Sequence, residues 1–428
     1  MRRDNATAPR TIEVWAAWAG LEKATLVGVL HAMPGRGREI FSFEYDPQWL
    51  QQPDCRSLDP ALTLFTGPQY PASDRHYFGV FLDSCPDRWG RVLLKRREAQ
   101  AAREEGRATR ELRESDFLLG VYDGYRMGGL RFKTEPDGPF LDDNKAFAAP
   151  PWTSLRELEQ ASLKIEQPGS EQQEGYAQWL RLLLAPGGSL GGARPKAAVT
   201  DPAGQLWIAK FPSQRDESDI GAWECVAHTL ATRAGIRTTE AMCRQFTSEH
   251  HTFLTRRFDR NASGERLHFA SAMTLLGRTD GDDYSTGASY LELAELLIQQ
   301  GVRTEEDLHE LWRRIAFSVC ISNVDDHLRN HGFLLEPGGW ALSPAYDLNP
   351  VPYGEGLKLN ISEADNSQDL DLVREVSPYF RLRSERAEEV LQEVVSAVRT
   401  WREVAAGMGL CAREQDQMAG AFRVAAST

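Results

Sequence analysis

The stretch ISNVDDHLRNHGFLL, residues 321–335, gathers polar side chains between two apolar runs. Asp325 and Asp326 are adjacent, and two histidines, an arginine and an asparagine follow within five residues. Carboxylates and imidazoles are common proton carriers in catalysis, and Mg²⁺ prefers oxygen ligands. Because charged groups are rarely buried without a partner, the pattern indicates an active site on a loop, with apolar flanks that anchor it in a core.

Asp325 and Asn330 form the pattern D-x-x-x-x-N. In the catalytic loop of protein kinases, the aspartate of this pattern accepts the proton of the substrate hydroxyl, and the asparagine holds Mg²⁺. Asp347 follows two short strand-like runs, GFLL and WALS, so a hairpin could bring this second carboxylate to Asn330. One Asp and one Asn suffice for Mg²⁺ when phosphate oxygens and water complete the shell.

Three upstream elements have the chemistry to bind a nucleotide. The glycine-rich segment 186–196 allows a close backbone approach to a ligand, although it does not match a Walker A loop. Lys210 lies in an apolar strand-like run, and Glu224 lies in an amphipathic helix predicted over 219–236. A strand lysine followed by a helix glutamate is the kinase ion pair that orients the lysine towards phosphates. The alternatives are a surface turn, an outward-facing strand lysine and a solvated helix face.

The order of these elements is that of a kinase fold: glycine loop, strand lysine, helix glutamate, D-x-x-x-x-N and a later aspartate. Two departures disfavour an ordinary eukaryotic-type kinase. Asn323 stands where the HRD motif has histidine, and Leu348 and Asn349 follow Asp347 in place of Phe-Gly.

The elements that must position these residues fall into three predicted parts. Residues 1–135 contain strand-like runs followed by a charged helical stretch, which indicates a small α+β unit. Residues 136–260 are predicted to be the nucleotide-binding N-lobe, and residues 261–428 a mostly helical C-lobe with the catalytic loop and the metal-binding aspartate. The expected fold class is therefore α+β, a kinase-like two-lobed fold with a small N-terminal α+β subdomain.

Composition limits the function classes. The chain of 428 residues is long enough for two or three domains. Its formal charge of −13 argues against broad binding of a phosphate backbone by this chain alone. No secretory signal and no apolar run of membrane-spanning length is evident, and the six cysteines are scattered without a CxxC pair. We therefore expect a protein of the reducing cytoplasm that does not enter a membrane.

Six ordered motifs carry a family resemblance: SLGGARPK, WIAKFPS, WECVAHTLATRAGI, RRFDR, NVDDHLRNHGF and SPAYDLNP. Together they resemble the HipA family, serine/threonine kinases that act as the toxins of type II toxin–antitoxin systems. The stretch FGVFLDSCPDRWGRVLL is similar to the amino-terminal subdomain of that family. The resemblance extends over most of the chain, from about residue 12 to 400.

The resemblance implies a role for each matched position. Asp325 would be the catalytic base, and Asn330 and Asp347 would bind Mg²⁺. Ser189 matches the serine that these kinases autophosphorylate, which ejects the loop and silences the enzyme. Glu224 would pair with Lys210. The nucleotide would be bound by Gly191, Gly192, Ala193, Arg194, Lys196, Lys210, Arg256, Arg257, Phe258, His327, Asn330 and Asp347.

The resemblance also implies cofactors and partners. ATP and Mg²⁺ would be the cofactors. The antitoxin would be a HipB-like helix-turn-helix dimer that binds operator DNA and holds the toxin, and the acidic balance of this chain fits DNA contact made mainly by such a partner. The substrates of the family include aminoacyl-tRNA synthetases.

Three other functions remain open. A small-molecule phosphotransferase of kinase-like fold shares the same aspartate and asparagine pattern. A metal-dependent hydrolase could use His327 and His331, but Leu328 stands where the zinc motif has glutamate, and no third ligand is evident. A catalytically inactive interaction subunit is disfavoured because every expected catalytic residue is present.

Overall fold

The structure is a computed structural model that describes residues 9–53, 55–73, 75–145, 148–184, 192 and 194–427. The chain forms two compact units, which are Met1–Gln214 with Asp259–Ala270 and Arg215–Phe258 with Ser271–Thr428. Both units combine helices with strands, so the predicted α+β class is confirmed. The three-part functional division made from the sequence stays a prediction, because these units are defined by compactness alone.

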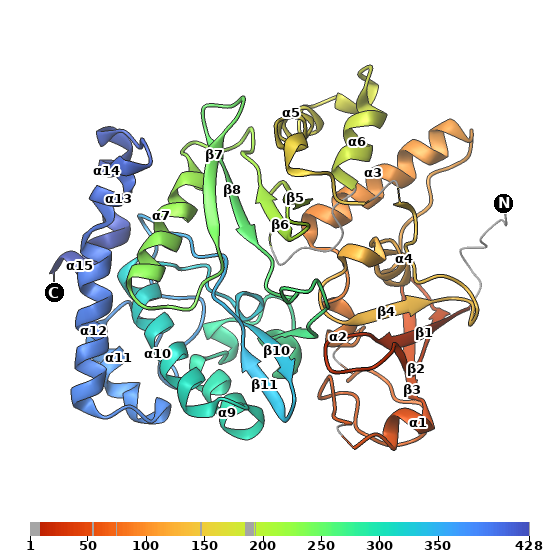
Figure 1. Cartoon of the computed structure of the whole chain (residues 1–428), viewed down its shortest axis with the longest axis horizontal. Coiled ribbons are helices and arrows are strands. Elements are labelled where there is room, and N and C mark those ends of the chain that lie inside the picture. The colour runs from red at the N-terminus through yellow and green to blue at the C-terminus, as the bar shows by residue number, and fades with distance from the viewer. Residues whose placement is uncertain are drawn as a thin grey trace. The chain divides into compact units, whose positions relative to one another are not determined.

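An antiparallel sheet of order β3-β2-β1-β4 opens the first unit (Figure 1). Its strands are β1 (Arg10–Ala16), β2 (Thr25–Pro34), β3 (Glu39–Tyr45) and β4 (Leu130–Lys133). Alternate residues of β1 and β3 are buried, as the period of two in a strand requires. Aromatic side chains fill the core, where the ring of Phe81 lies 5.6 Å from that of Phe43 and 6.1 Å from that of Phe132.

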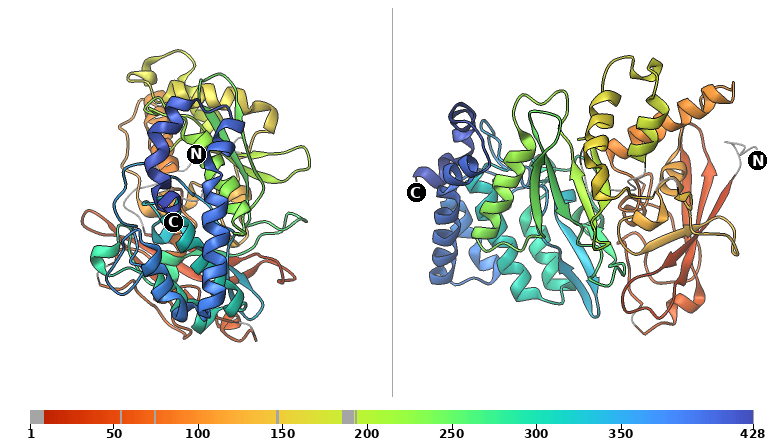
Figure 2. Two further views of the ribbon diagram at one scale, coloured as in Figure 1. Left: turned by 90° about the vertical axis from the view of Figure 1, so that its left-hand side faces the viewer. Right: turned by 45° about the horizontal axis from the view of Figure 1, so that its top comes forward.

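Helices and two further strands complete the first unit. The elements are α1 (Pro47–Leu50), α2 (Gly79–Leu82), α3 (Arg88–Glu104), α4 (Glu114–Leu119), α5 (Leu155–Ile165), α6 (Tyr176–Leu184), β5 (Lys196–Thr200) and β6 (Leu206–Lys210). Helix α6 packs against both α3 and α5 (Figures 1 and 2). The strands β5 and β6 are antiparallel, and this pairing places Lys196 directly opposite Lys210.

The second unit is mostly helical. Its elements are α7 (Ile220–Arg233), β7 (Ala241–Gln245), β8 (His251–Arg256), α8 (Ala272–Leu275), α9 (Tyr290–Gln300), α10 (Thr304–Cys320), β10 (Gly332–Glu336), β11 (Gly339–Leu342), α11 (Leu370–Val376), α12 (Ser384–Arg399), α13 (Trp401–Gly407), α14 (Ala412–Met418) and α15 (Arg423–Ser427). Strand β9 (Phe269–Ser271) spans the boundary between the two units along the chain. Helix α10 is buried over most of its length, and α12 packs against both α10 and α7 (Figures 1 and 2). The hairpin predicted after the polar loop is confirmed as β10 and β11.

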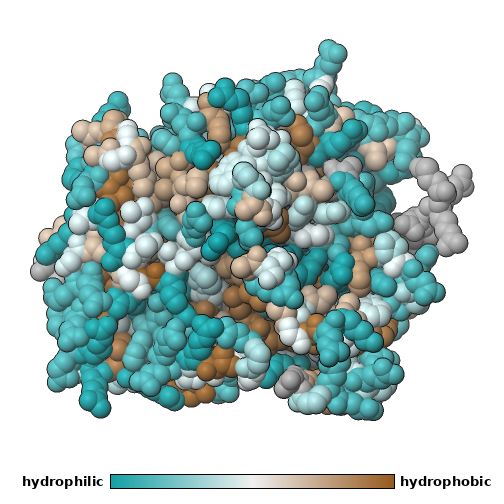
Figure 3. Space-filling view, viewed as in Figure 1, coloured by the Kyte–Doolittle hydropathy of each residue, from teal (hydrophilic) through white to brown (hydrophobic). Residues whose placement is uncertain are grey.

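The face of the molecule that Figure 3 shows is largely polar, and hydrophilic residues predominate on it. Within the described part of the chain, no helix combines the length and the apolar character needed to cross a membrane.

Arg126 joins several loops of the first unit. Its guanidinium is fully buried and donates hydrogen bonds of 2.7–3.0 Å to four backbone carbonyls, those of Ser84, Leu118, Val121 and Leu141. A buried carbonyl that loses its donor incurs a desolvation penalty. This one side chain therefore holds the segments that flank β4 on the N-terminal sheet.

We predict that Arg126→Met destabilises the first unit, because each buried carbonyl left without a donor costs about 1–3 kcal/mol. Arg126→Lys should recover only part of the loss, because an ammonium cannot reproduce the planar fork of the guanidinium. Urea denaturation measures the effect, with Arg88→Met at an exposed arginine of the same unit as the control. Equal stability of the Arg126 and Arg88 variants would contradict this role.

Candidate active site

Helix α10 carries the chain directly into the polar loop. Ser322 is fully buried and has a φ of 49°, in the left-handed region that few residues other than glycine adopt. The backbone N–H of Asn323 donates to the carbonyl of Ser318 at 2.9 Å, so the chain turns back onto the last turn of the helix. One 3₁₀ turn, Leu328–Asn330, then leads into β10.

The two adjacent aspartates have different surroundings. Asp325 is exposed, whereas Asp326 retains only 4% of its accessible surface. Tyr290 Oη donates to Asp326 Oδ2 at 2.6 Å, Ser318 Oγ donates to the same oxygen at 3.3 Å, and His331 Nε2 lies 3.0 Å from Oδ1. Burial raises the pKa of Asp326, but the nearby His331 and the Tyr290 hydroxyl lower it by more, so the pKa lies below its usual value. Asp326 is thus an ionised group that fixes the loop from inside.

Asn330 presents an acceptor oxygen that no side chain or backbone group of the described chain uses. Its Nδ2 donates to the carbonyl of Asp325 at 3.1 Å, while its Oδ1 is buried without a hydrogen-bond partner. A buried acceptor left without a donor is costly unless a ligand satisfies it. An amide oxygen is a suitable ligand for Mg²⁺, so Asn330 fits the predicted metal site.

The hairpin returns the chain to this loop, and Asp347 lies in the returning segment. Tyr346 Oη donates to the carbonyl of Arg329 at 2.7 Å, and the N–H of Asn349 donates to Asn323 Oδ1 at 3.3 Å. Asp347 itself has a φ of 58° and is half-buried. Uncommon backbone conformations cluster at functional sites, where the surroundings must enforce them. Asp347 therefore lies between two contacts that tie its segment to the loop of Asp325 and Asn330.

The predicted adenine hinge adjoins the same segment. Arg256 ends β8 and is exposed, Arg257 is buried, and Phe258 is half-buried. The ring of Phe258 lies 5.4 Å from that of Tyr346, the residue that precedes Asp347. The second unit thus brings one predicted nucleotide-binding segment next to the predicted metal-binding segment.

The lysines predicted to contact phosphates lie in the first unit, and both are buried, at 3% for Lys196 and 8% for Lys210. Lys196 Nζ lies 3.0 Å from Asp87 Oδ2 and 3.5 Å from the carbonyl of Gly192, whose φ is 87°. Like charges that face each other on paired strands repel, and Asp87 offsets this repulsion at Lys196. The alternative of a solvent-facing Lys210 is wrong, because the side chain is buried.

The remaining predicted residues are distributed between the two units. Arg194 is half-buried in the first unit, and Glu224 is buried in α7 of the second, so the alternative of a solvated helix face is wrong for Glu224. His327, in the second unit, is half-buried, and its Nδ1 has no hydrogen-bond partner within the described chain. Ser189, Gly191 and Ala193 lie outside the described residues.

The hydrolase alternative finds little support here. His331, one of the two histidines that it needs, lies against the carboxylate of Asp326. Among the residues that the structure describes, no group of three or more His, Cys, Asp and Glu side chains is arranged to hold a metal. A site of the kinase type does not need such a group, because asparagine and phosphate oxygens supply its ligands.

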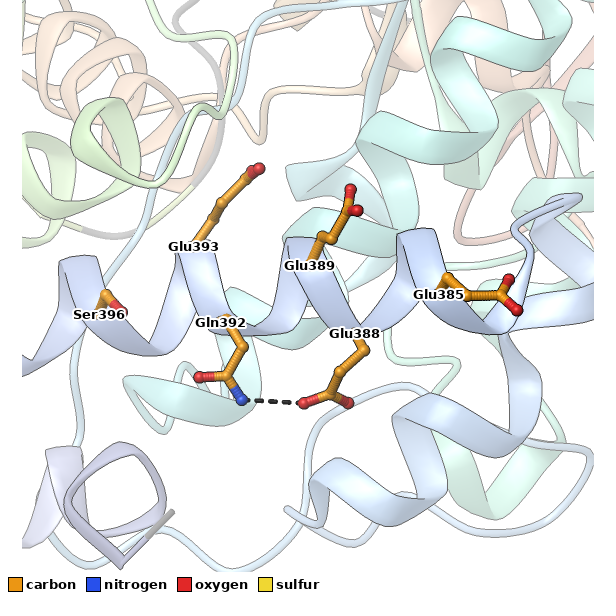
Figure 4. Close-up of a pocket in the computed structure, with 6 residues that line it drawn as sticks. All are labelled: Glu385, Glu388, Glu389, Gln392, Glu393 and Ser396. Atoms are coloured by element: carbon orange, nitrogen blue, oxygen red, sulfur yellow. Dashed lines mark hydrogen bonds between the residues drawn. The ribbon is translucent and has the colours of Figure 1, made fainter.

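A hollow that is lined mainly by glutamates lies along α12 (Figure 4). The residues that line it are Glu385, Glu388, Glu389, Gln392, Glu393 and Ser396. Three of these carboxylates face arginines, with Glu388 at 2.9 Å from Arg374, Glu389 at 2.8 Å from Arg386 and Glu393 at 2.6 Å from Arg313. The hollow is therefore the side of a helix with exposed ion pairs, and it does not hold the residues of the candidate site.

The tertiary contacts of two further residues, Tyr290 and Asp87, are not indicated by the sequence. Tyr290 reaches Asp326 from α9, and nothing in the sequence around Tyr290 indicates this contact. Asp87 caps the N-terminus of α3 by accepting from the N–H of Gly90 at 2.8 Å. The Pro-Asp pair before a helical run is a recognisable cap signal, but its pairing with Lys196 depends on the tertiary fold.

Comparison with known proteins assigns the family. A family model of the HipA-like C-terminal domain matches residues 188–402, just over half of the chain. The chain therefore belongs to the HipA-like family. Its fold is similar to that of HipA from Shewanella oneidensis MR-1, solved with HipB and operator DNA, at a TM-score of 0.63, 19% identity, and coverage of 97% of this chain and 96% of that chain.

Two curated relatives match part of the chain. "Putative kinase Y4dM" of Sinorhizobium fredii is 32% identical over 175 residues, which cover 37% of this chain and 41% of the relative. "Toxin YjjJ" of Escherichia coli is 27% identical over 177 residues, 39% of each chain. The match thus extends over about two fifths of the length of each relative.

We predict that Tyr290→Phe weakens the fold in a pH-dependent way. The pKa of Asp326 is lowered in the folded state, so its ionisation stabilises the fold fully above the usual pKa of about 4, and this contribution is lost as the pH falls from there through the lower folded-state pKa. Loss of the Tyr290 hydroxyl raises this folded-state pKa. We expect the free energy of unfolding to fall by roughly 1.5–3 kcal/mol at neutral pH, the range for a hydrogen bond to a charged group.

Urea denaturation between pH 3 and pH 7 tests this expectation. The difference in stability between wild type and Tyr290→Phe should narrow as the pH falls through the folded-state pKa of Asp326, because the ionised carboxylate is then lost. Tyr284→Phe, at a half-exposed tyrosine of the same unit, is the control. A difference that does not change with pH would show that the tyrosine acts through packing.

Proposed function

We propose that this chain is an ATP- and Mg²⁺-dependent serine/threonine protein kinase that acts in the cytoplasm as the toxin of a toxin–antitoxin pair. The observation that carries the proposal is the different exposure of the polar side chains in one loop. Asp325 faces solvent while Asp326 is held inside, and Asn330 keeps a buried acceptor oxygen without a partner in the described chain. Contacts beside Asp347 bring that carboxylate's segment back to the same loop.

In this proposal, bound ATP with Mg²⁺ supplies the γ-phosphoryl group. Asp325 accepts the proton of a serine or threonine hydroxyl as that oxygen attacks the γ-phosphorus, and ADP leaves. Asn330 and Asp347 would hold the metal. The segment of Arg256, Arg257 and Phe258 would face the adenine, mostly through its backbone. Lys210, oriented by Glu224, would contact the phosphates.

The proposed partners rest on the family. HipA of Shewanella oneidensis was solved with HipB and operator DNA, and the relative in Escherichia coli is named a toxin. By analogy, the partner of this chain would be a HipB-like helix-turn-helix antitoxin that makes most of the DNA contact. The formal charge of −13 on this chain agrees with DNA contact made mainly by the antitoxin. The phosphorylated substrate would be a cellular protein of the aminoacyl-tRNA synthetase class.

We predict that Asp325→Asn reduces phosphotransfer by roughly 10²–10⁴, the usual contribution of a general base. Stability should not change, because Asp325 is exposed. Peptide mass spectrometry after incubation with ATP should find one phosphate on Ser189 in the wild type and none in the variant. Asp416→Asn, at another exposed aspartate of the second unit, should behave as the wild type. An Asp325→Asn protein that retains full phosphotransfer would refute the assignment.

We predict that Asn330→Ala and Asp347→Ala weaken nucleotide binding only when Mg²⁺ is present. Each variant removes one proposed metal ligand, and we expect a loss of at least about tenfold, the lower limit when even an outer-shell partner of a metal ligand is removed. Calorimetry with ATP, with and without Mg²⁺, measures it. Asn330→Asp, which retains an oxygen ligand, is the matched control. Equal losses without the metal would indicate that these residues act on the nucleotide directly.

A further inference from the structure

Arg423 connects three segments of the second unit. Its Nη1 donates to Ser322 Oγ at 3.0 Å, and its Nη2 donates to the carbonyl of Gly354 at 3.1 Å and to Gln368 Oε1. Ser322 begins the loop that contains Asp325, and Gly354 lies in the chain beyond the hairpin. A guanidinium suits this task because its planar fork can serve several acceptors at once.

Ser322 is the point at which this contact reaches the catalytic loop. The residue is fully buried in a left-handed conformation, and its carbonyl accepts from the N–H of Val324 at 2.9 Å and from that of Val351 at 3.3 Å. Its Oγ also donates to Gln368 Oε1 at 3.0 Å. Such a backbone conformation persists only when the surroundings enforce it. Groups that hold Ser322 therefore also restrict Asp325, three residues further on.

Two glycines allow the same segments to approach closely. A Cβ on Gly354 would lie 2.3 Å from Cγ1 of Val324, the residue before Asp325, and a Cβ on Gly420 would lie 2.3 Å from the carbonyl oxygen of Pro352. The segment 419–423 thus packs on the loop 351–354, which packs on the catalytic loop. Between the two contacts, Tyr353 is 83% exposed.

We propose that Arg423 is a positioning residue that clamps the loop 351–354 onto the catalytic loop, so that Asp325 and Tyr353 are presented together to the polypeptide that carries the acceptor hydroxyl. The proposal rests on the kinase function proposed above. Within the described chain, the hydrogen bonds of Arg423 go to neither Asn330 nor Asp347. The clamp should therefore affect the phosphoryl-transfer step and not the binding of nucleotide with Mg²⁺.

Arg423→Met tests the clamp, and Arg399→Met is the matched control. Arg399 is also exposed and holds the same helix, since its Nε donates to the carbonyl of Ala425 at 2.9 Å. In Arg423→Met we expect the autophosphorylation rate at saturating ATP and Mg²⁺ to fall by about 10²-fold, the effect of a misplacement of about 1 Å. The Kd of a fluorescent ATP analogue with Mg²⁺ should not change, and Arg423→Lys should recover part of the rate.

A second measurement does not depend on phosphotransfer. Hydrogen exchange of peptides that cover residues 321–325 and 350–355 should be faster in Arg423→Met and unchanged in Arg399→Met. Ser322→Ala should cause less change when it is added to Arg423→Met than when it is made alone, because residues that share a contact are not additive. If exchange is faster in Arg423→Met but the wild type shows no phosphotransfer, the kinase function is refuted while the clamp is supported. Wild-type exchange and rate in Arg423→Met, or equal losses in both methionine variants, would overturn the clamp.

Discussion

The candidate site depends on the rule that a buried charge must be satisfied. The carboxylate of Asp326 receives hydrogen bonds from Tyr290 and Ser318 and lies against His331, so three elements of the second unit converge on one group. Breaking such a contact leaves an uncompensated charge in the interior, which is strongly unfavourable. The loop therefore has one stable arrangement. Asp325, the preceding residue, is exposed.

The first unit obeys the same rule with the opposite sign of charge. Lys196 and Lys210 face each other across β5 and β6, both are buried, and Asp87 balances Lys196 from the N-terminus of α3. A buried ammonium group is costly unless it is paired, and the carboxylate of Asp87 reduces that cost at Lys196.

Local patterns in the sequence predicted the parts of the fold that local forces determine. Strands within residues 1–135, a helix within residues 219–236 and the hairpin after the polar loop are found as expected, as β1 to β3, α7 and β10–β11. The spacing of Asp325 and Asn330 could be read directly. The sequence does not indicate which of the two adjacent aspartates is buried, because burial depends on the contact between Asp326 and Tyr290 of α9. The contact of Arg423 with Ser322 is equally remote, joining residues 101 positions apart.

One aromatic cluster supports both ends of the proposed machinery in the second unit. The rings of Trp401 and Phe422 stack at 4.4 Å, and Trp223 lies 6.1 Å from the first and 6.3 Å from the second. Trp223 precedes Glu224, and Phe422 precedes Arg423. Interlocked buried rings move little without loss of packing. The backbone positions of the helix glutamate and of the clamp arginine are therefore set by the same core, although each belongs to a different part of the proposed mechanism.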